Sequence, residues 1–463
     1  MSDTSFLSLN LNEDLIKNIS SLGYVEMTPI QAKSLPDILK GLDLIGQGIT
    51  GSGKTAAFSL GLLSRLDVKN FRIQAVVLCP TRELADQVAN EIRKLGRTIH
   101  NIKVLTLCGG TPFGPQVGSL EHGAHIVVGT PGRILDHLNK ATLNLNSVTM
   151  LVLDEADRML DMGFQSSLDA IMNQLPEKRQ TLLFSATYPD EIQSISSRIM
   201  SNPIIVRIAA SEEKSTIKQH FYKINDEAHR LAALRLLLLE SRPESAIIFC
   251  ETKKETQEIA DQLESFGFSS VALHGDMEQK DRDQTLIRFA NKSASILVAT
   301  DVAARGLDIE ALAAVINYRL ARDVEVHIHR VGRTGRAGNT GNAYSFFSEK
   351  ERHRVNLLEA YLSLIIIPEK LPETKALEKN PPRAPMETLQ IDGGKKQKIR
   401  AGDILGALTG ENGVNGSQVG KINISDNWSF VAVSSDAYKV ALHKLGAGKL
   451  KGRSFRVRLI RGS

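Results

Sequence analysis

Short apolar runs alternate with amphipathic stretches in the first half of the chain. Over residues 40–208, strand-like runs are separated by segments whose apolar residues recur at helical spacing, as in 82–95 and 132–139. This rhythm predicts a doubly wound parallel sheet, because parallel strands are buried on both faces and need long crossovers. A strand should end near Asp43–Ile45, before five further strands: Ala75–Cys79, Val104–Leu107, Ile126–Val128, Met150–Leu153 and Thr181–Phe184.

A polar stretch at 209–216 interrupts the pattern, which then restarts over residues 217–367. Helical periodicity returns near 226–239, 253–266 and 279–290. The chain therefore predicts a second α/β lobe of similar size, with residues 1–208 as the first lobe and 209–216 as a linker. Its expected strands are Ala246–Cys250, Val271–Leu273, Ile296–Ala299 and Val315–Tyr318.

The last part of the chain has a different pattern. Residues 368–387 are rich in Pro, Lys and Glu and are expected to form a linker. Residues 388–463 then read strand, helix, strand, strand, helix, strand, which favours a small RRM-like α+β domain. The segments are Thr388–Ile391, Gly402–Leu408, Lys421–Ile424, Ser429–Val433, Asp436–Leu445 and Ser454–Leu459.

Composition limits the class of protein. Hydrophobic residues make up 42% of the 463 residues, which is enough for full cores. The three cysteines, Cys79, Cys108 and Cys250, are too far apart for a disulfide framework or a zinc site and favour a reducing compartment. No apolar run approaches 18 residues, and the N-terminus lacks the features of a signal peptide. We therefore expect a monomeric cytoplasmic protein with no membrane contact.

Charge is concentrated at the C-terminal end. Residues 386–463 hold 13 Lys and Arg against 6 Asp and Glu, a net charge of +7. Since the whole chain carries +5, residues 1–385 carry −2. The basic segment predicts a polyanionic partner such as nucleic acid, although charge alone also fits a solvated surface.

A glycine-rich loop follows the first strand. It has the pattern G-x-x-x-x-G-K-T, in which successive backbone N–H groups and a helix N-terminus face phosphate groups. Lys54 should reach the β- and γ-phosphates of ATP, and the Thr55 hydroxyl should bind Mg²⁺. The expected nucleotide contacts of the loop are Gly48, Ile49, Thr50, Gly51, Ser52, Gly53, Lys54 and Thr55.

An apolar strand, Leu151–Leu153, runs into the acidic residues Asp154, Glu155 and Asp157. A buried parallel strand ends in this way where it reaches the ligand-facing edge of its sheet. We expect Asp154 to hold Mg²⁺ and Glu155 to orient or deprotonate the water that attacks the γ-phosphate.

Further motifs resemble those of the DEAD-box RNA helicases of superfamily 2, in that family's order, over residues 6 to about 365. One departure is Gly48, where the family usually has alanine. The motifs are Phe6 with Gly23–Tyr24 and Thr28–Gln31, Pro80–Leu84, Gly109–Gly110, Thr130–Arg133, Asp154–Asp157, Ser185–Thr187, Gln279 with Arg282, Ala299–Asp308 and His329–Arg336.

The resemblance implies roles for individual residues. Tyr24 and Gln31 would contact adenine, Asp308 would contact the nucleotide, and His329, Arg333 and Arg336 would join the catalytic set. The implied RNA-backbone contacts are Thr81, Arg82, Gly110, Thr130, Gly132 and Arg133 in the first lobe, and Arg282 and Thr300 in the second.

Physical chemistry supports parts of this assignment. The Gln31 amide offers a donor and an acceptor, which suits the N6 and N7 edge of adenine. Arg333 and Arg336 are three residues apart, so they should share one helix face. Arginines that reach a γ-phosphate from a second lobe typically accelerate hydrolysis by about 10³ to 10⁵-fold. Hydrolysis would then require closed lobes, which bound RNA favours.

The C-terminal segment resembles the RNA-binding domain of the bacterial DbpA subfamily, notably over Ile391–Arg400 and Gly402–Leu408. That resemblance implies binding to a hairpin of large-subunit ribosomal RNA, with contacts from Lys395, Lys396 and Lys398. Trp428 and Phe430 are the nearby aromatic residues of the expected sheet, and the usual aromatic RNP pair is not evident. We therefore expect basic loop contacts to dominate over base stacking.

Together these features predict an ATP-dependent RNA helicase that remodels 23S ribosomal RNA in assembly of the 50S subunit. An ATP-gated RNA clamp that does not unwind would carry the same motifs. A DNA helicase of the same superfamily is a second alternative, against which the Gln31 element and the C-terminal domain argue.

Overall fold

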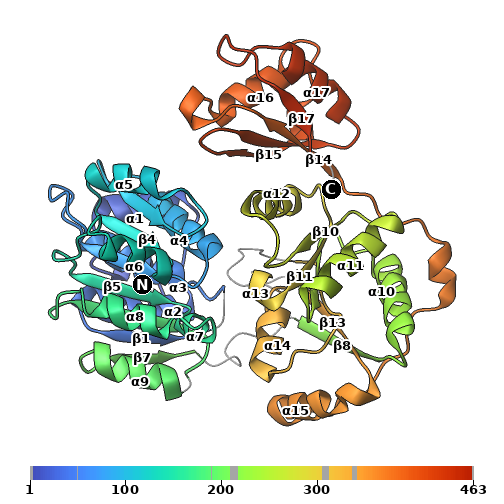
Figure 1. Ribbon diagram of the computed structural model, residues 1–463, viewed down its shortest axis with the longest axis horizontal. Helices are drawn as coiled ribbons and strands as arrows, with labels where there is room; N and C mark the ends of the chain where they lie inside the picture. Colours follow the sequence, from blue (N-terminus) through green and yellow to red (C-terminus); the bar gives the residue numbers. More distant parts are fainter. Residues whose placement is uncertain are drawn as a thin grey trace. The chain divides into compact units, whose positions relative to one another are not determined.

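The computed structural model describes residues 4–48, 51–188, 190–208, 217–304, 312–335 and 341–460. Two compact units divide the chain near residue 216. The first is an α/β lobe, and the second contains another α/β lobe and a small C-terminal domain (Figure 1). The predicted fold class, two parallel-sheet lobes with a small α+β domain, is confirmed.

The first lobe is built on a seven-stranded parallel sheet with the order β3-β4-β2-β5-β6-β1-β7. Central strands such as β5 are fully buried, as the continuous apolar runs predicted. The strands are β1 (Leu44–Gln47), β2 (Ala75–Leu78), β3 (Val104–Leu107), β4 (Ile126–Gly129), β5 (Met150–Asp154), β6 (Gln180–Ser185) and β7 (Ile204–Arg207). The edge strand β7 was not predicted; its sequence starts with three apolar residues, but three of its four residues are exposed.

Helices cover this sheet (Figure 1). Side-chain caps define several of them: Asn12 caps α1 and Thr81 caps α4. The helices are α1 (Glu13–Ser21), α2 (Pro29–Lys40), α3 (Lys54–Ser64), α4 (Arg82–Leu95), α5 (Phe113–Glu121), α6 (Pro131–Asn139), α7 (Ala156–Asp161), α8 (Gln165–Met172) and α9 (Asp190–Ile199), with a 3₁₀ turn η1 (Phe6–Ser8).

The second lobe has a six-stranded parallel sheet with the order β10-β11-β9-β12-β13-β8. Four of its strands match the predicted runs, whereas β8 and β13 were not predicted. Polar residues interrupt both of these strands, which pair with each other along one edge. The strands are β8 (Ile217–Lys223), β9 (Ala246–Cys250), β10 (Ser270–Leu273), β11 (Ile296–Thr300), β12 (Ala314–Asn317) and β13 (Gly341–Phe347).

The helices of this lobe follow the amphipathic segments of the sequence. Asp226 and Thr252 cap the first two of them. They are α10 (Glu227–Ser241), α11 (Lys253–Ser265), α12 (Gln279–Ala290), α13 (Asp301–Ala304), α14 (Val324–Val331) and α15 (Arg352–Leu362), with 3₁₀ turns η2 (Glu349–Glu351) and η3 (Thr374–Glu378).

The C-terminal domain has a four-stranded antiparallel sheet with the order β15-β16-β14-β17 and two helices. Its core lies between the helices and one sheet face, and includes Leu389, Val431 and Ile404. The elements are β14 (Met386–Ile391), η4 (Lys395–Gln397), α16 (Ala401–Thr409), η5 (Gly416–Gln418), β15 (Val419–Ile424), β16 (Ser429–Ser434), α17 (Tyr438–Ala447) and β17 (Val457–Leu459).

The two parallel sheets position the chemistry. In the first lobe, β1, β2, β5 and β6 lead into the phosphate loop, Thr81, the acidic motif and Ser185–Thr187, so these segments meet at one sheet edge. In the second lobe, β11 ends at Thr300 on the corresponding edge. Within the described ranges, no helix has the length and apolar character needed to cross a membrane.

Candidate nucleotide site and RNA-binding surfaces

The phosphate loop closes tightly around Gly53, which begins the turn into α3. Its φ of +96° is a left-handed conformation. A Cβ at this position would lie 2.5 Å from Gln31 Nε2 and 2.8 Å from Thr28 Oγ1, so only glycine fits. Gly51 is also left-handed, and Ser52 is buried. Ile49 and Thr50, two of the predicted contacts, lie outside the described residues.

Lys54 is buried and donates a hydrogen bond from Nζ to the carbonyl oxygen of Gly48, at 2.5 Å. Burial lowers the pKa of Lys54, while the charges of Asp154 and Glu155 act in the opposite direction. The loop therefore supplies its own acceptor for the lysine. An ammonium group has three N–H donors, so this bond leaves two that could reach phosphate oxygens. Thr55 follows directly as the second residue of α3.

Asp154 ends β5 in a buried position. Burial, reinforced by the neighbouring Glu155, raises the pKa of Asp154 to about 7, and Lys54 offsets only part of this effect. A nearby cation would stabilise the ionised form of this carboxylate. Asp154 and the Thr55 hydroxyl offer oxygen ligands, which suit Mg²⁺. No cluster of three or more His, Cys, Asp or Glu side chains able to hold a metal occurs among the residues described.

Glu155 has an unusual backbone. Its φ of 51° places a residue with a Cβ in the left-handed region, a conformation that costs about 1 kcal/mol or more and is common in active sites. Its carboxylate accepts a hydrogen bond from Arg158 Nη1 at 3.0 Å, and both side chains are buried. The ion pair holds the carboxylate beside Asp154. Arg158 was not predicted from the sequence, where it reads as an ordinary helical arginine.

Gln31 connects the predicted adenine site to the phosphate loop. Its Oε1 accepts from the Thr28 backbone N–H at 2.9 Å, and its Nε2 donates to the Gly53 carbonyl at 3.1 Å. One N–H donor and one lone pair of the amide are left over. An adenine edge requires one of each, since its N7 accepts a hydrogen bond and its N6 donates one. The Tyr24 hydroxyl donates to Glu91 at 2.5 Å, and its ring packs edge-on against Phe6.

The first-lobe residues predicted to bind RNA lie after β2, β3 and β4. Thr81 caps α4, and Thr130 precedes α6. Gly110 has a φ of +71°, and a Cβ there would collide with the guanidinium of Arg82. Arg133 donates to the carbonyl of Thr111 at 3.0 Å. Space is open beside Gly132, where a Cβ would meet no atom within 4 Å.

In the second lobe, Arg282 Nη1 donates to the His274 carbonyl at 3.3 Å, and Thr300 ends β11. Arg330, which was not singled out from the sequence, makes a two-pronged ion pair with Asp301 at 2.6 and 2.7 Å. His329 lies beside it on α14. Asp308 and Arg336 lie outside the described residues.

One sequence prediction about the arginine motif is wrong. Arg333 was expected on a helix face shared with Arg336, but α14 ends at Val331. Arg333 is buried in the turn that follows, where Gly335 has a φ of +68°. Gly332 follows the last residue of α14 and Gly335 has a left-handed backbone, and glycines at such positions end helices. The three-residue spacing of the two arginines does not take these glycines into account.

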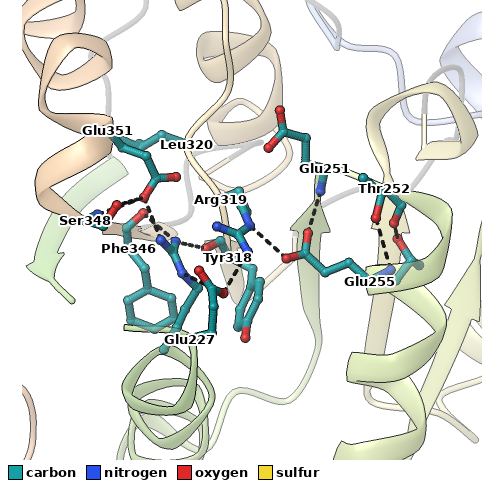
Figure 2. Close-up of polar contacts among 12 residues, drawn as sticks. Glu227, Glu251, Thr252, Glu255, Tyr318, Arg319, Leu320, Phe346, Ser348 and Glu351 are labelled. Atoms are coloured by element: carbon teal, nitrogen blue, oxygen red, sulfur yellow. Dashed lines mark hydrogen bonds and ion pairs between the residues drawn. The ribbon is translucent and has the colours of Figure 1, made fainter. Parts of the chain in front are cut away.

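A network of charged side chains joins the elements of the second lobe at the same sheet edge (Figure 2). Arg319 lies between Glu255, at 2.8 Å, and Glu227, at 2.7 Å. Arg230 is only 1% exposed and binds Glu351 at 2.6 Å. These pairs, with the bond from Arg230 to the Tyr318 carbonyl, connect α10, α11 and η2 to the segment after β12.

The predicted RNA-binding lysines of the C-terminal domain lie on a rigid loop. Backbone N–H groups of Lys395 and Lys396 donate to the carbonyls of Ser425 and Asp426, in the turn between β15 and β16. A Cβ at Gly394 would collide with the same turn. The side chains of Lys395, Lys396 and Lys398 are exposed, so the loop presents positive charge to solvent.

The outer face of the C-terminal sheet is not open. Thr388 is fully buried and hydrogen-bonds to Ser293 at 2.7 Å and Asn291 at 3.2 Å, in the turn after α12. Phe430 is 3% exposed and lies outside the core cluster of the domain, whereas Trp428, at the turn, is 40% exposed. Phe430 therefore cannot stack on a base, which agrees with the expectation of basic contacts.

Comparisons with known proteins agree with this organisation. The DEAD/DEAH box helicase family matches residues 28–195, the helicase conserved C-terminal domain matches residues 229–338, and the DbpA RNA binding domain matches residues 388–459. Among solved structures, the chain is similar to S. cerevisiae Dbp5 bound to RNA and ADP BeF3. That match has a TM-score of 0.71 and 32% identity, and covers 79% of this chain and 95% of the other.

The two lobes and their motifs show that the chain belongs to the DEAD-box family of ATP-dependent RNA helicases. It is therefore an RNA-stimulated ATPase that binds a nucleotide and RNA. Within the family, it is 50% identical over 459 residues to the ATP-dependent RNA helicase DbpA of Escherichia coli, a match that covers 99% of this chain and 100% of the relative. The helicase CshA of Listeria monocytogenes is 44% identical over 356 residues, covering 77% of this chain and 68% of the relative.

Proposed function

We propose that this helicase remodels 23S ribosomal RNA during assembly of the 50S subunit, and that its C-terminal domain holds an RNA hairpin there. The observation that carries the proposal is the DbpA RNA binding domain over residues 388–459, with its lysines on a rigid loop. The segment 386–463 has a net charge of +7, whereas the rest of the chain has −2. The domain would therefore provide the electrostatic hold on RNA.

At the ATP site, Lys54 would donate hydrogen bonds to the β- and γ-phosphates, and Asp154 with Thr55 would hold Mg²⁺. The ion, when bound, would offset negative charge on the phosphates. Glu155 would orient the attacking water and accept its proton at the carboxylate, whose position Arg158 fixes. Arg333 would supply positive charge to the γ-phosphate from the second lobe.

The loops after β2, β3 and β4 would hold the RNA backbone without reading its sequence. Backbone N–H groups, hydroxyls and arginines contact phosphate and sugar, which carry no direct base information. Discrimination between RNA and DNA would come from the 2′-hydroxyl. The C-terminal domain would therefore select the particular hairpin. The protein would work as a monomer in the cytoplasm.

ATPase assays against fragments of 23S RNA test this proposal. One hairpin fragment should stimulate hydrolysis at a concentration at least tenfold lower than a shuffled RNA of equal length or the corresponding DNA. Strand displacement from a duplex beside that hairpin should require ATP. Equal stimulation by all RNAs would contradict the rRNA target, and tight ATP-dependent binding without displacement would instead indicate a clamp.

A further inference from the structure

The side chain of Gln116 connects two of the loops assigned to the RNA backbone. It lies on α5, is buried, and comes between the segments 108–111 and 130–137. Its Nε2 donates to the carbonyl of Cys108 at 3.0 Å and to Thr111 Oγ1 at 2.5 Å. Its Oε1 accepts from Arg133 Nη1 and from His137 Nε2, both at 3.0 Å.

These four contacts use the whole hydrogen-bonding capacity of a primary amide, which has two N–H donors and two lone pairs on oxygen. The two N–H donors bind Cys108 and Thr111, at the two ends of the Gly109–Gly110 loop. The two lone pairs accept from Arg133 and His137 on α6, the helix after Thr130. A side chain that is satisfied on all sides has one orientation. Gln116 therefore fixes the separation of the two loops, because neither can move away without leaving a buried polar atom unpaired.

His137 binds the oxygen of the Gln116 amide. It is fully buried, its ring stacks on Phe113 with centroids 4.1 Å apart, and its Nδ1 lies 2.8 Å from Thr142 Oγ1. Since Gln116 Oε1 can only accept, the proton must be on Nε2. The Thr142 hydroxyl has one proton, which Nδ1 of the neutral ring shares with the His137 carbonyl at 3.1 Å. Burial and the nearby charge of Arg133 lower the pKa of His137, which keeps the ring neutral.

Arg133 is held at two points of this arrangement. One nitrogen, Nη1, donates both to Gln116 and to the Thr111 carbonyl at 3.0 Å. On the other side of the loop, Gly110 lies against the Arg82 guanidinium. Both arginines thus contact the segment Gly110–Thr111 in the protein without RNA.

We propose that Gln116, supported by His137, is a positioning residue that fixes Arg133 and the Gly109–Thr111 loop in the geometry that an RNA sugar-phosphate backbone requires. This inference rests on the proposed RNA contacts of those two loops. Ordering the loops in the free protein reduces the entropy that binding would otherwise cost. RNA affinity should therefore depend on an amide that does not touch RNA.

The test compares Gln116→Met, which keeps the length of the side chain but forms none of the four bonds, with the full-length parent protein. Gln193→Met, at an exposed glutamine of α9 in the same lobe, is the matched control. The RNA concentration for half-maximal ATPase stimulation should rise at least tenfold for Gln116→Met. ATP affinity, RNA-independent hydrolysis and the rate at saturating RNA should stay within twofold, and Gln193→Met should match the parent.

A double-mutant cycle with Arg133→Ala separates positioning from a general loss of structure. If Gln116 acts in part through Arg133, Gln116→Met should weaken RNA stimulation less in the Arg133→Ala background than in the parent. Full additivity of the two effects, or a half-saturating RNA concentration for Gln116→Met within twofold of the parent, would overturn the inference. If Gln116→Met unfolds at the assay temperature, Gln116→Glu replaces it. That variant keeps the oxygen that accepts from Arg133 and His137 and loses both N–H donors. It should still raise the RNA concentration for half-maximal ATPase stimulation at least threefold.

The same measurements distinguish this inference from its premise. Should Arg133→Ala bind RNA as the parent does, the RNA role of the loop fails, and the positioning role fails with it. Should Arg133→Ala weaken RNA stimulation while both Gln116 variants leave it unchanged, the RNA role stands and only the positioning role is refuted.

Discussion

Asp157 holds Thr187 by two hydrogen bonds to one carboxylate oxygen: Oδ2 accepts from the backbone N–H and from the hydroxyl of Thr187, each at 3.0 Å. The same oxygen accepts from the Ala186 N–H at 3.2 Å. The end of the acidic motif is thereby joined to the segment that follows β6. We therefore predict that a change at the nucleotide is transmitted to Ser185–Thr187 through this carboxylate.

Asp157→Asn should weaken that connection, because an amide nitrogen in place of Oδ2 would face three donors. A buried polar group left unpaired costs about 1–3 kcal/mol. ATP affinity should change less than threefold, and unwinding per ATP hydrolysed should fall. Parallel measurements of phosphate release and strand displacement check this; an unchanged ratio would contradict the coupling role.

Glu155→Gln should bind ATP and RNA and hydrolyse ATP slowly, since the water loses its base while Asp154 remains. A loss of about 10² to 10⁴-fold in turnover is typical for a general base. Glu177→Gln, at an exposed glutamate of the same lobe, should behave as the parent. Turnover of Glu155→Gln near the parent value under saturating RNA would remove Glu155 from its role.

Glu351→Gln should make the second lobe less stable at neutral pH. Burial alone would raise the pKa of Glu351, but hydrogen bonds from Arg230 and Ser348 outweigh it, and the pKa is lowered from 4.5. The carboxylate therefore stabilises the fold above about pH 4.5, and this contribution is lost as the pH falls through the lower folded value. Without that charge, the buried Arg230 has no buried carboxylate beside it, at a cost of about 3 kcal/mol.

Urea unfolding of the parent and Glu351→Gln at pH 7, 5 and 4 would measure this difference. The gap in free energy of unfolding should be largest at pH 7 and shrink as the pH falls below 4.5. A gap that stays constant across this range would show that ionisation of Glu351 does not contribute.

Lys395→Ala combined with Lys396→Ala should weaken hairpin binding and flatten its salt dependence. Removing one lysine–phosphate ion pair reduces the slope of log affinity against log salt by about 0.7 to 0.9. Titrations at several salt concentrations test this, with Lys17→Ala plus Lys178→Ala in the first lobe as a charge-matched control. Trp428→Ala should have a smaller effect than the lysine pair; the reverse order would indicate that stacking dominates.

Much of the nucleotide site could be predicted because its chemistry depends on short motifs at strand ends. Lys54, Asp154 and Gln31 do lie around one loop, as their spacing suggested. Their roles stay predictions until tested. Strands such as β5 were also predictable, since both faces are buried and the apolar run is continuous.

Other features left no local signal. Gln116 and His137 are single polar residues in amphipathic helices, and only the fold shows that they meet. Arg230 and Glu351 are 121 residues apart, so their ion pair depends on how α10 packs beside β13. The edge strand β8 was missed because polar residues interrupt its apolar pattern. The apolar run of β7 is only three residues long, which is too short to distinguish a strand from a loop.

The bonds of Thr388 with Asn291 and Ser293 have a consequence for protein engineering. A C-terminal domain transplanted onto another helicase would carry a buried threonine and Phe430 into solvent unless the new host supplied an equivalent turn after its α12. The parent lobe, once stripped of the domain, would in turn expose the polar side chains of that turn. Chimeras that exchange RNA specificity between helicases should therefore take residues 291–293 together with the domain.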